Sequence, residues 1–425
     1  MQRIEIAPRA DWKSKAEALG FDWHSAPTSD DPAGTYWDES AYWRLTADEV
    51  DALEAATNEL HAMCLAAVEQ AIARKLLPYF GFDPQTVALI QESWHRRGPH
   101  DSSGDQLSIY GRFDFAYTGD GPPKMLEYNA DTPTGLYEAA VVQWMWLEER
   151  FPDSDQFNSL HEGLVEAWRK MRENLPQGEN DAAALHLTCL TPHAEDEGTL
   201  HYMLDTALEA GWTAKTIAAS DIGWAVPGDV DDPADVSNHP DGHFTDLQDM
   251  PIHALFKIVP WDWLLADDFG ARLIRAVTDK RLTVIEPAWK MVPANKAILA
   301  LLWEMYPDHP NLLPAFMDRT SFAAGTKVVA KPLLGREGAN ISIAILGEGG
   351  ALAGAPIASS EGAYGSEGYV YQAHAPLASA TDAKGVTHHA VIGSWVVDGL
   401  SRGIGIREDT GLITHNRSRF VPHLF

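Results

Sequence analysis

RFDFAYTGDGPPKMLEYNADTPT, residues 112–134, carries the strongest structural signal in this chain. Two segments of alternating apolar and polar residues flank the turn-rich TGDGPPK, and such alternation predicts a β-hairpin with one buried face. Because side chains alternate with period 2 along a strand, Arg112 and Asp114 share one face, while Phe113 and Phe115 take the other. The hairpin therefore separates a polar face from a core-facing one.

The second strand adds Glu127 and Asn129 to the polar face. Once the strands pair, Asp114, Glu127 and Asn129 gather into an oxygen patch, and oxygen ligands of this kind are those that Mg²⁺ prefers when it also holds phosphates. A solvated sheet face with no metal is the alternative, and the pattern alone leaves both interpretations open.

The residues that follow the hairpin predict a helix. Thr132 fits an N-cap and Pro133 the first helical position, so we expect a helix N-terminus with free amide donors beside the oxygen patch. Such an N-terminus would favour anions.

Composition restricts the class of protein. The chain has 425 residues, 45% of them hydrophobic, and 32 Lys and Arg against 61 Asp and Glu give a formal charge of −29. A chain of this length can bury a substantial core, and the acidic balance argues against nucleic acids and anionic membranes as partners. It favours a cationic partner or substrate, although acidic surfaces also serve solubility alone.

Cysteine usage and the N-terminus indicate a compartment. The two cysteines, Cys64 and Cys189, lie in apolar segments, which predicts core residues and no disulfide framework. The N-terminal residues lack the apolar run of a signal peptide, and no stretch is apolar enough for a membrane span. We therefore expect a cytoplasmic protein; the sequence does not predict its oligomeric state.

Two further patterns organise the first two thirds of the chain. Thr46 and Glu49 form a capping box at the start of a long amphipathic helix. Residues 183–220 read as strand, helix and strand, a β-α-β unit of the parallel kind. Residues 195–197, EDE, follow its first strand, where open α/β sheets place ligand contacts, although acidic residues also favour a helix N-terminus for its dipole. Residues 229–244 indicate a polar loop or weak hairpin.

The last hundred residues predict several short antiparallel strands with glycine turns, a mixed α+β lobe. Lys331 ends one of these strands and is followed by a glycine loop, residues 335–338, and a second strand. Backbone amides in such a loop can close over a polyphosphate while a lysine counters its charge. The pattern is not a Walker motif, and GIGIRED at residues 403–409 is not a dinucleotide-binding fingerprint.

The order of the motifs is more specific than any one of them. YGRFDF, LEYNADTPT, EDE, PANKAILALLWE, AKPLLGREGANI, YVYQ and GIGIRED together resemble the glutathionylspermidine synthase family, of the ATP-grasp superfamily. The resemblance covers nearly the whole chain and implies one catalytic region over residues 1–425. It implies an ATP-grasp fold, with mixed α/β and α+β structure, a β-α-β subdomain and an antiparallel nucleotide-binding lobe.

The resemblance also implies roles for individual residues. Mg²⁺ would be held by Asp114, Glu127 and Asn129, and ATP phosphates would contact Lys296, Lys331 and the glycine loop through Gly335 and Gly338. Gln372 would lie near the adenine, and Arg112 and Arg407 would neutralise the phosphoryl group during transfer. The site for the thiol-peptide or amine substrate would be lined by Thr132, Thr134, Asp196 and Glu197.

The implied activity is ATP- and Mg²⁺-dependent ligation of a glutathione-like carboxylate to a polyamine-like amine through an acyl phosphate. Two departures bear on the substrates. The chain has no room for the amidase domain of bifunctional members, and Thr132 and Thr134 stand where serines are expected. Two rivals stay open: a nucleotide- or polyamine-binding protein without ligase activity, and a kinase-like or peptide-extending enzyme with an amino-acid nucleophile.

The glycines predict lids. The glycine loop and the Gly/Ala/Ser-rich residues 347–368 would be mobile without nucleotide and become ordered over ATP, because glycine raises backbone entropy and lids need low local stability.

Overall fold

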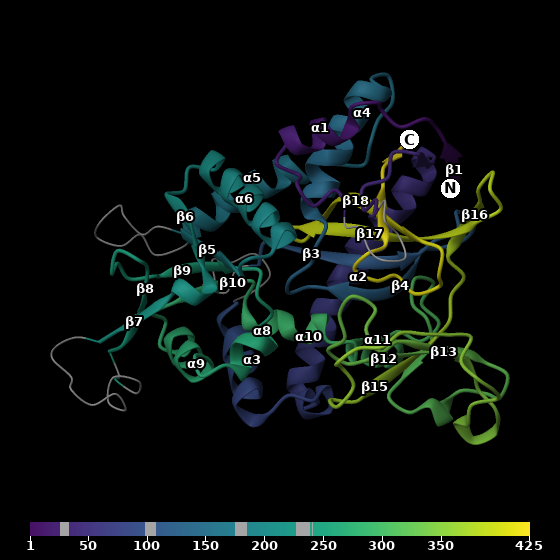
Figure 1. Ribbon diagram of the computed structural model, residues 1–425. Helices are drawn as coiled ribbons and strands as arrows, with labels where there is room; N and C mark the ends of the chain where they lie inside the picture. The colour runs from purple at the N-terminus through teal and green to yellow at the C-terminus, as the bar shows by residue number, and fades with distance from the viewer. Residues whose placement is uncertain (26–33, 98–107, 175–184, 227–238, 240) are drawn as a thin grey trace.

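The computed structural model describes residues 1–25, 34–97, 108–174, 185–226, 239 and 241–425. Most of the polar segment expected at 229–244 lies outside these residues. Figure 1 shows three larger sheets in the described chain: a parallel sheet on the left, a six-stranded antiparallel sheet at the upper right and a five-stranded antiparallel sheet below it.

The six-stranded sheet contains the predicted hairpin. Its strands are β3 (Tyr110–Ala116), β4 (Lys124–Asn129), β16 (Ala378–Thr381), β17 (Thr387–Val397), β18 (Leu400–Asp409) and β19 (Arg419–Val421). They run in the order β19-β18-β17-β3-β4, with β16 also paired to β17. Arg112 lies opposite Asn129, and Asp114 lies opposite Glu127. The hairpin and its polar face are therefore confirmed.

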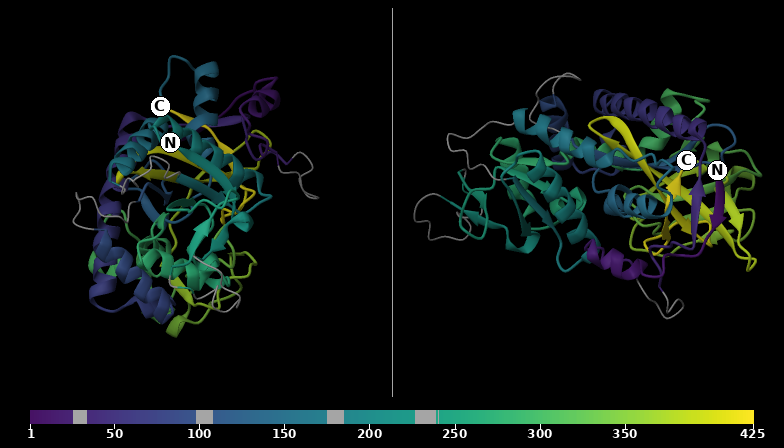
Figure 2. Two further views of the ribbon diagram at one scale, coloured as in Figure 1. Left: turned by 90° about the vertical axis from the view of Figure 1, so that its left-hand side faces the viewer. Right: turned by 90° about the horizontal axis from the view of Figure 1, so that it is seen from above.

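The apolar face of this sheet packs against a single long helix. Helix α2 (Ala47–Ala73) begins with the predicted capping box, in which the Thr46 side chain accepts from the Glu49 amide and the Glu49 carboxylate accepts from the Thr46 amide. Its buried side chains share one core with Phe113 and Phe115. Figure 1 and Figure 2 show the purple α2 crossing one face of these strands. Because α2 covers the apolar face of the sheet, the polar side chains of the hairpin lie on the opposite face.

The parallel sheet confirms the β-α-β unit. It has the order β10-β9-β5-β6 and is built from β5 (Leu185–Cys189), β6 (Ala214–Ala218), β9 (Ala254–Lys257) and β10 (Thr283–Ile285). The crossover helix is α6 (Ala194–Glu209), and α5 (Leu160–Asn174) packs beside it. Helices α8 (Trp261–Ala266) and α9 (Gly270–Thr278) follow β9.

The five-stranded sheet is the predicted antiparallel lobe. Its order is β11-β15-β12-β13-β14, with β11 (Ala315–Phe316), β12 (Lys327–Pro332), β13 (Ser342–Ile345), β14 (Ala358–Ser359) and β15 (Tyr369–Ala373). The glycine loop joins β12 to β13, as the sequence predicts.

The remaining elements close the molecule. A small sheet of β1 (Gln2–Glu5), β2 (Ala41–Arg44) and β20 (His423–Leu424) brings the two ends of the described chain together (Figure 1). The other pieces are α1 (Trp12–Ala18), α3 (Pro84–Arg96), α10 (Met291–Ala294), α11 (Ile298–Met305), β7 (Gly223–Ala225) and β8 (His243–Thr245).

Two further expectations concern single residues and the membrane. Cys64 and Cys189 are free and buried, so the predicted core role is confirmed. Among the described residues, no helix combines the length and the apolar character that crossing a membrane requires.

The predicted N-cap at Thr132 is wrong. The helical backbone begins only at Leu136 and continues through a π-helical segment (Glu138–Val142) into α4 (Gln143–Arg150). Gly135 has φ +80°, a left-handed conformation that cannot continue a right-handed helix through Pro133. In addition, the Thr134 carbonyl is taken by the Arg112 guanidinium.

Candidate functional site

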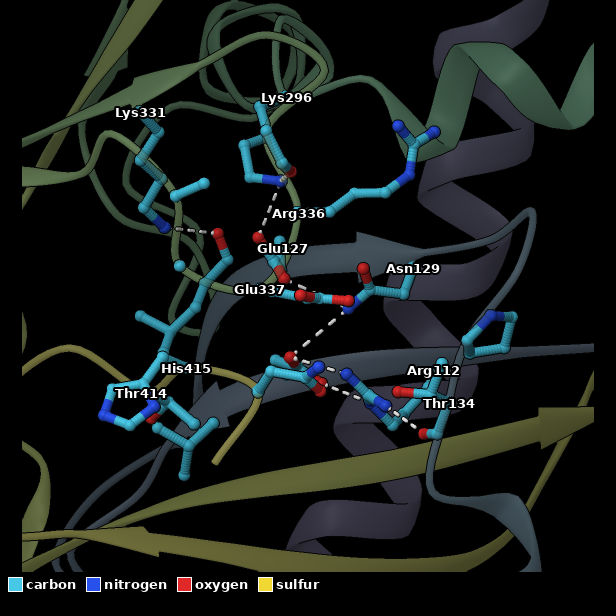
Figure 3. A pocket seen from close by; sticks show the side chains of 18 of the residues that line it. Arg112, Glu127, Asn129, Thr134, Lys296, Lys331, Arg336, Glu337, Thr414 and His415 are labelled. Atoms are coloured by element: carbon cyan, nitrogen blue, oxygen red, sulfur yellow. Dashed lines mark hydrogen bonds and ion pairs between the residues drawn. The ribbon is translucent and has the colours of Figure 1, made fainter. Parts of the chain in front are cut away.

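A cavity of about 360 Å³ lies where the three larger sheets meet. The polar face of the six-stranded sheet forms one wall, β12, β15 and the glycine loop form a second, and the residues after β5 and β9 form the third. We call this the central cavity. Figure 3 shows Lys296 and Lys331 approaching Glu127 from one side and Arg112 lying on the other.

The oxygen patch is assembled as the hairpin predicts. Asn129 Nδ2 donates to Asp114 Oδ2 at 3.2 Å and to Glu127 Oε1 at 3.1 Å, so the three side chains form one cluster. Arg112 binds the Asp114 carboxylate through Nε at 2.7 Å and Nη2 at 3.1 Å. Lys296 Nζ lies 2.9 Å from Glu127 Oε2.

These residues fit a magnesium ion by chemistry. Two carboxylates and one amide are hard oxygen donors, the set that Mg²⁺ uses together with substrate phosphates. Among the described residues, no group of three or more His, Cys, Asp and Glu side chains could hold a metal. The oxygen patch has two carboxylates, so a metal there would need Asn129 and further oxygens from a ligand.

The two carboxylates differ electrostatically. Burial raises the pKa of Asp114 above its ordinary value, and the neighbouring Arg112 offsets only part of this rise. Burial also acts to raise the pKa of Glu127, but Lys296 and Lys331 outweigh it and lower that pKa to about 2. Glu127 is therefore the carboxylate held most firmly in its charged form.

Lys331 links the antiparallel lobe to the hairpin. Its ammonium donates to the Leu126 carbonyl and to Gln372 Oε1, both at 2.8 Å, and Gln372 Nε2 donates to the Met125 carbonyl at 3.0 Å. Burial lowers the pKa of Lys331 to about 8, although Glu127 acts in the opposite direction. A bound polyanion would favour its protonated form.

Two cationic side chains help to fasten the glycine loop. Lys296 Nζ donates to the Gly335 carbonyl at 2.6 Å. Arg336 forms a two-pronged ion pair with Asp262 of α8, with distances of 2.6 and 3.1 Å. The Arg336 pair connects the loop across the cavity to the residues that follow β9.

Arg407 reaches the cavity from β18. Its Nε donates to the Ser418 carbonyl at 2.9 Å, and Nη2 donates to the carbonyls of His415 and Asn416 at 3.1 and 3.0 Å. The guanidinium also lies 5.2 Å from the centre of the Tyr36 ring. Backbone carbonyls of residues 410–418, which we call the C-terminal loop, thus hold this cation.

The three acidic residues at the start of α6 lie in two different environments. Glu195 and Asp196 line the cavity. Glu195 Oε1 is buried with no hydrogen-bond partner among the described residues, and burial together with Glu138 raises the pKa of Glu195 to about 8. Glu197 instead accepts from the His193 amide at 2.9 Å and serves the helix end.

A buried ion pair supports the cavity floor. Lys257 Nζ lies 2.6 Å from Asp131 Oδ1, and Asp131 Oδ2 accepts from the Trp261 amide at 3.0 Å. This pair joins the end of the hairpin to the parallel sheet. Neither partner is left as an uncompensated buried charge.

The cavity gathers every predicted site residue except Glu197. Those that line it are Arg112, Asp114, Glu127, Asn129, Thr132, Thr134, Asp196, Lys296, Lys331, Gly335, Gly338, Gln372 and Arg407. Their individual roles stay predictions.

Several charged lining residues were not assigned roles from the sequence. They are Asp131, Glu195, Asp262, Arg336, Glu337 and His415. Glu195 belongs to the EDE triplet and Arg336 to the GREG segment. Both are charged residues beside a predicted contact, and this feature of the sequence could have identified them as lining residues. Asp262 carried no such signal, because it lies on α8 and meets the glycine loop, through Arg336, only in the folded chain.

Comparison with known proteins supports the family resemblance of the sequence motifs. The glutathionylspermidine synthase preATP-grasp family matches residues 3–425. A Haemophilus influenzae protein named provisionally as an acid–amine ligase is 38% identical over the full length of both chains. Trypanothione synthetase of Crithidia fasciculata is 28% identical over 78% of this chain and 49% of its own length.

Two further comparisons bear on length and fold. The bifunctional glutathionylspermidine synthetase/amidase of Escherichia coli is 27% identical over 71% of this chain and 48% of its own length. The chain thus spans about half the length of that enzyme and of the trypanothione synthetase. A glutathione synthetase-like effector of Globodera pallida has a TM-score of 0.55 at 8% identity, covering 97% of this chain and 96% of its own, which supports the fold alone.

The predicted ATP-grasp fold is thereby confirmed, and the chain belongs to the glutathionylspermidine synthase family.

Proposed function

We propose that residues 1–425 form one catalytic region that joins a small carboxylic acid to an amine, using ATP and Mg²⁺. The observation that carries the proposal is the central cavity, in which the oxygen patch lies among Lys296, Lys331 and Arg112 (Figure 3). Arg407 lines the same cavity. The family and the names of its members support the enzyme class.

The first step transfers a phosphoryl group. A carboxylate oxygen of the acid attacks the γ-phosphorus of ATP, and the bond between this phosphorus and the β-γ bridging oxygen breaks. ADP is released, and the acid becomes an acyl phosphate. Such transfer depends on positioned charge more than on covalent help. Lys296 and Lys331 would bind phosphate oxygens, and Arg112 and Arg407 would stabilise the charge of the moving group. Mg²⁺ held by Asp114, Glu127 and Asn129 would neutralise phosphate charge.

The second step forms the amide. The neutral amine nitrogen attacks the acyl carbon and the C–O bond to phosphate breaks. The proton lost by the nitrogen leaves with the released inorganic phosphate. Asp196 lies on the cavity wall, where its carboxylate would attract a cationic amine, and the uncharged Glu195 lies beside it. Glu195 Oε1 has no competing partner among the described residues and would accept an N–H. Thr132 and Thr134 would contact the acid.

Arg407→Lys tests the chemistry. A planar guanidinium matches phosphate oxygens in a way that an ammonium does not, so we expect kcat to fall on the order of 10²-fold with little change in ATP affinity. The measurement is acid- and amine-dependent ADP release beside an ATP titration of the same variant. Turnover within a few-fold of the parent, or a loss confined to ATP affinity, would remove Arg407 from the catalytic residues.

The substrates themselves need a separate experiment. Native mass spectrometry of the protein with candidate acids and amines would identify which bind, and the product mass would separate amide formation from amino-acid extension. ATP turnover that no acid and amine pair stimulates would favour a binding protein without ligase activity.

A further inference from the structure

The residue next to Arg407 on β18 is a buried glutamate that faces the other way. The Glu408 side chain is 0% exposed. It accepts from Arg3 Nε at 2.7 Å and Nη2 at 3.0 Å, and from Trp43 Nε1 at 3.1 Å. A strand near the N-terminus, β1, thus binds the back of the strand that carries Arg407.

Glu408 also binds the far end of the C-terminal loop. Arg419, the first residue of β19, lies opposite Glu408 in the sheet, and its Nη2 donates to Glu408 Oε1 at 3.3 Å. Arg419 Nη1 donates to Asp38 at 3.0 Å, and His388 Nδ1 lies 3.2 Å from Glu408 Oε1. Glu408 therefore fixes the strand that enters the C-terminal loop and the strand that leaves it.

The C-terminal loop is the part of the chain whose carbonyls hold Arg407. It also reaches the glycine loop, since a Cβ at Gly338 would collide with the Thr414 carbonyl. A shift at the base of this loop would move the three carbonyls that orient the guanidinium.

We infer that Glu408 is a positioning residue for Arg407. Held in place by Arg3, it acts through Arg419 on the C-terminal loop and touches no reacting atom. The inference rests on the proposed function, in which Arg407 stabilises the moving phosphoryl group. Misplacing a catalytic group by about 1 Å can cost up to 10²-fold in rate, so a partly released loop should lower kcat without removing the ATP site.

A purely structural role for Glu408 is the alternative, and the chain offers a matched control. The Glu39 side chain is also 0% exposed, binds Arg9 through two nitrogens and accepts from Trp37 Nε1 at 2.9 Å. Like Glu408 it accepts from one arginine and one tryptophan, but Arg9 and Trp37 neither belong to the C-terminal loop nor flank it.

The experiment compares Glu408→Gln with Glu39→Gln in the full chain. Both should lower the melting temperature to a similar extent. Only Glu408→Gln should lower kcat, on the order of 10-fold, with KM for ATP within about 2-fold. Only Glu408→Gln should speed amide hydrogen exchange in residues 410–418. Arg419→Met, which breaks the same link at a partly exposed side chain, should reproduce both effects if Glu408→Gln does not fold.

The outcomes separate the two claims. Equal kcat losses in Glu408→Gln and Glu39→Gln, or unchanged exchange in the C-terminal loop, would overturn the positioning role. A parent protein without acid- and amine-dependent ADP release would overturn the proposed function, while the exchange comparison would still show whether Glu408 fixes the loop.

Discussion

Asp114 is the carboxylate of the oxygen patch whose pKa burial raises, even with Arg112 bound to it. The pKa of Glu127 is lowered to about 2, because the nearby Lys296 and Lys331 outweigh the effect of burial. A dication placed between them would relieve the cost of a charged Asp114, because an added positive charge favours the ionised form. At the scale of the residue, metal binding and the charge state of Asp114 should be coupled.

Asp114→Asn tests this coupling. The amide keeps the shape and loses the charge, so we expect Mg²⁺-dependent ATP binding to weaken by about 10-fold or more, equal to ~1.4 kcal/mol. Isothermal titration with and without Mg²⁺ measures it. Asp120→Asn, at the exposed turn of the same hairpin, is the control and should bind as the parent does. Equal metal dependence in both variants would exclude the assigned metal site.

Glu195 gives a prediction about pH. Its pKa is raised to about 8 by burial and by Glu138, whereas an unfolded chain would titrate near its ordinary value. Between these two pH values the unfolded glutamate is charged and the folded one is not, so folding stability falls as pH rises toward 8 and changes no further above it.

Glu195→Gln should therefore be more stable than the parent at pH 7.5, by roughly 1–3 °C in melting temperature, and the gain should vanish near pH 4.5. Thermal denaturation across this range measures the difference. Glu197→Gln, two residues away and bound to the His193 amide, should show no such gain. A Glu195→Gln gain independent of pH would show that the carboxyl is not neutral in the folded protein.

At the scale of the element, the glycine loop has more anchors than its sequence indicates. Arg336 is paired with Asp262, and Ser360 Oγ donates to the Gly338 carbonyl. Just before the loop, the Leu334 amide donates to Glu367 Oε1 at 3.2 Å. Glu367 also accepts from the Gly365 amide at 2.8 Å, so the loop and residues 347–368 are tied to each other. The two predicted lids should then respond to nucleotide together.

Hydrogen exchange tests the lids. A non-hydrolysable ATP analogue with Mg²⁺ should slow exchange in residues 335–338 and 347–368, because a bound polyphosphate adds contacts to segments of low local stability. Arg336→Met should speed exchange in both segments without nucleotide, and α2 should be unchanged throughout. Protection that is equal with and without nucleotide would show that these segments are not lids.

At the scale of the whole molecule, three sheets contribute to one cavity and the surrounding chain carries a formal charge of −29. A field of that sign attracts cations over distances that salt shortens, with a screening length of about 10 Å at 0.1 M salt and 3 Å at 1 M. An amine substrate should feel this field, and an acid substrate should be repelled by it.

Raising NaCl from 50 to 300 mM should therefore raise KM for a polyamine by several-fold, on the order of 3-fold, and leave KM for the acid unchanged or lower. Steady-state kinetics with each substrate varied in turn measures both. A monoamine is the control and should respond less than a polyamine. A salt effect of the same size and direction on both substrates would indicate a general effect on the enzyme.

The sequence by itself determined the elements whose signals are local. Alternation over residues 112–129 predicts the hairpin and its faces, the Thr46 capping box predicts the start of α2, and residues 183–220 predict the β-α-β unit. Each depends on a side-chain period or on contacts within a few residues, so the chain needs no distant partner to specify it.

Only the tertiary structure decided the site. Lys331 meets the Leu126 carbonyl across more than two hundred residues, and Asp262 pairs with Arg336 of the glycine loop. Glu195 Oε1 is buried without a hydrogen-bond partner among the described residues. The wrong N-cap at Thr132 has the same origin, since a capping pattern is local but the Arg112 contact with the Thr134 carbonyl is not. Such contacts depend on how sheets from different parts of the chain pack, which no local periodicity encodes.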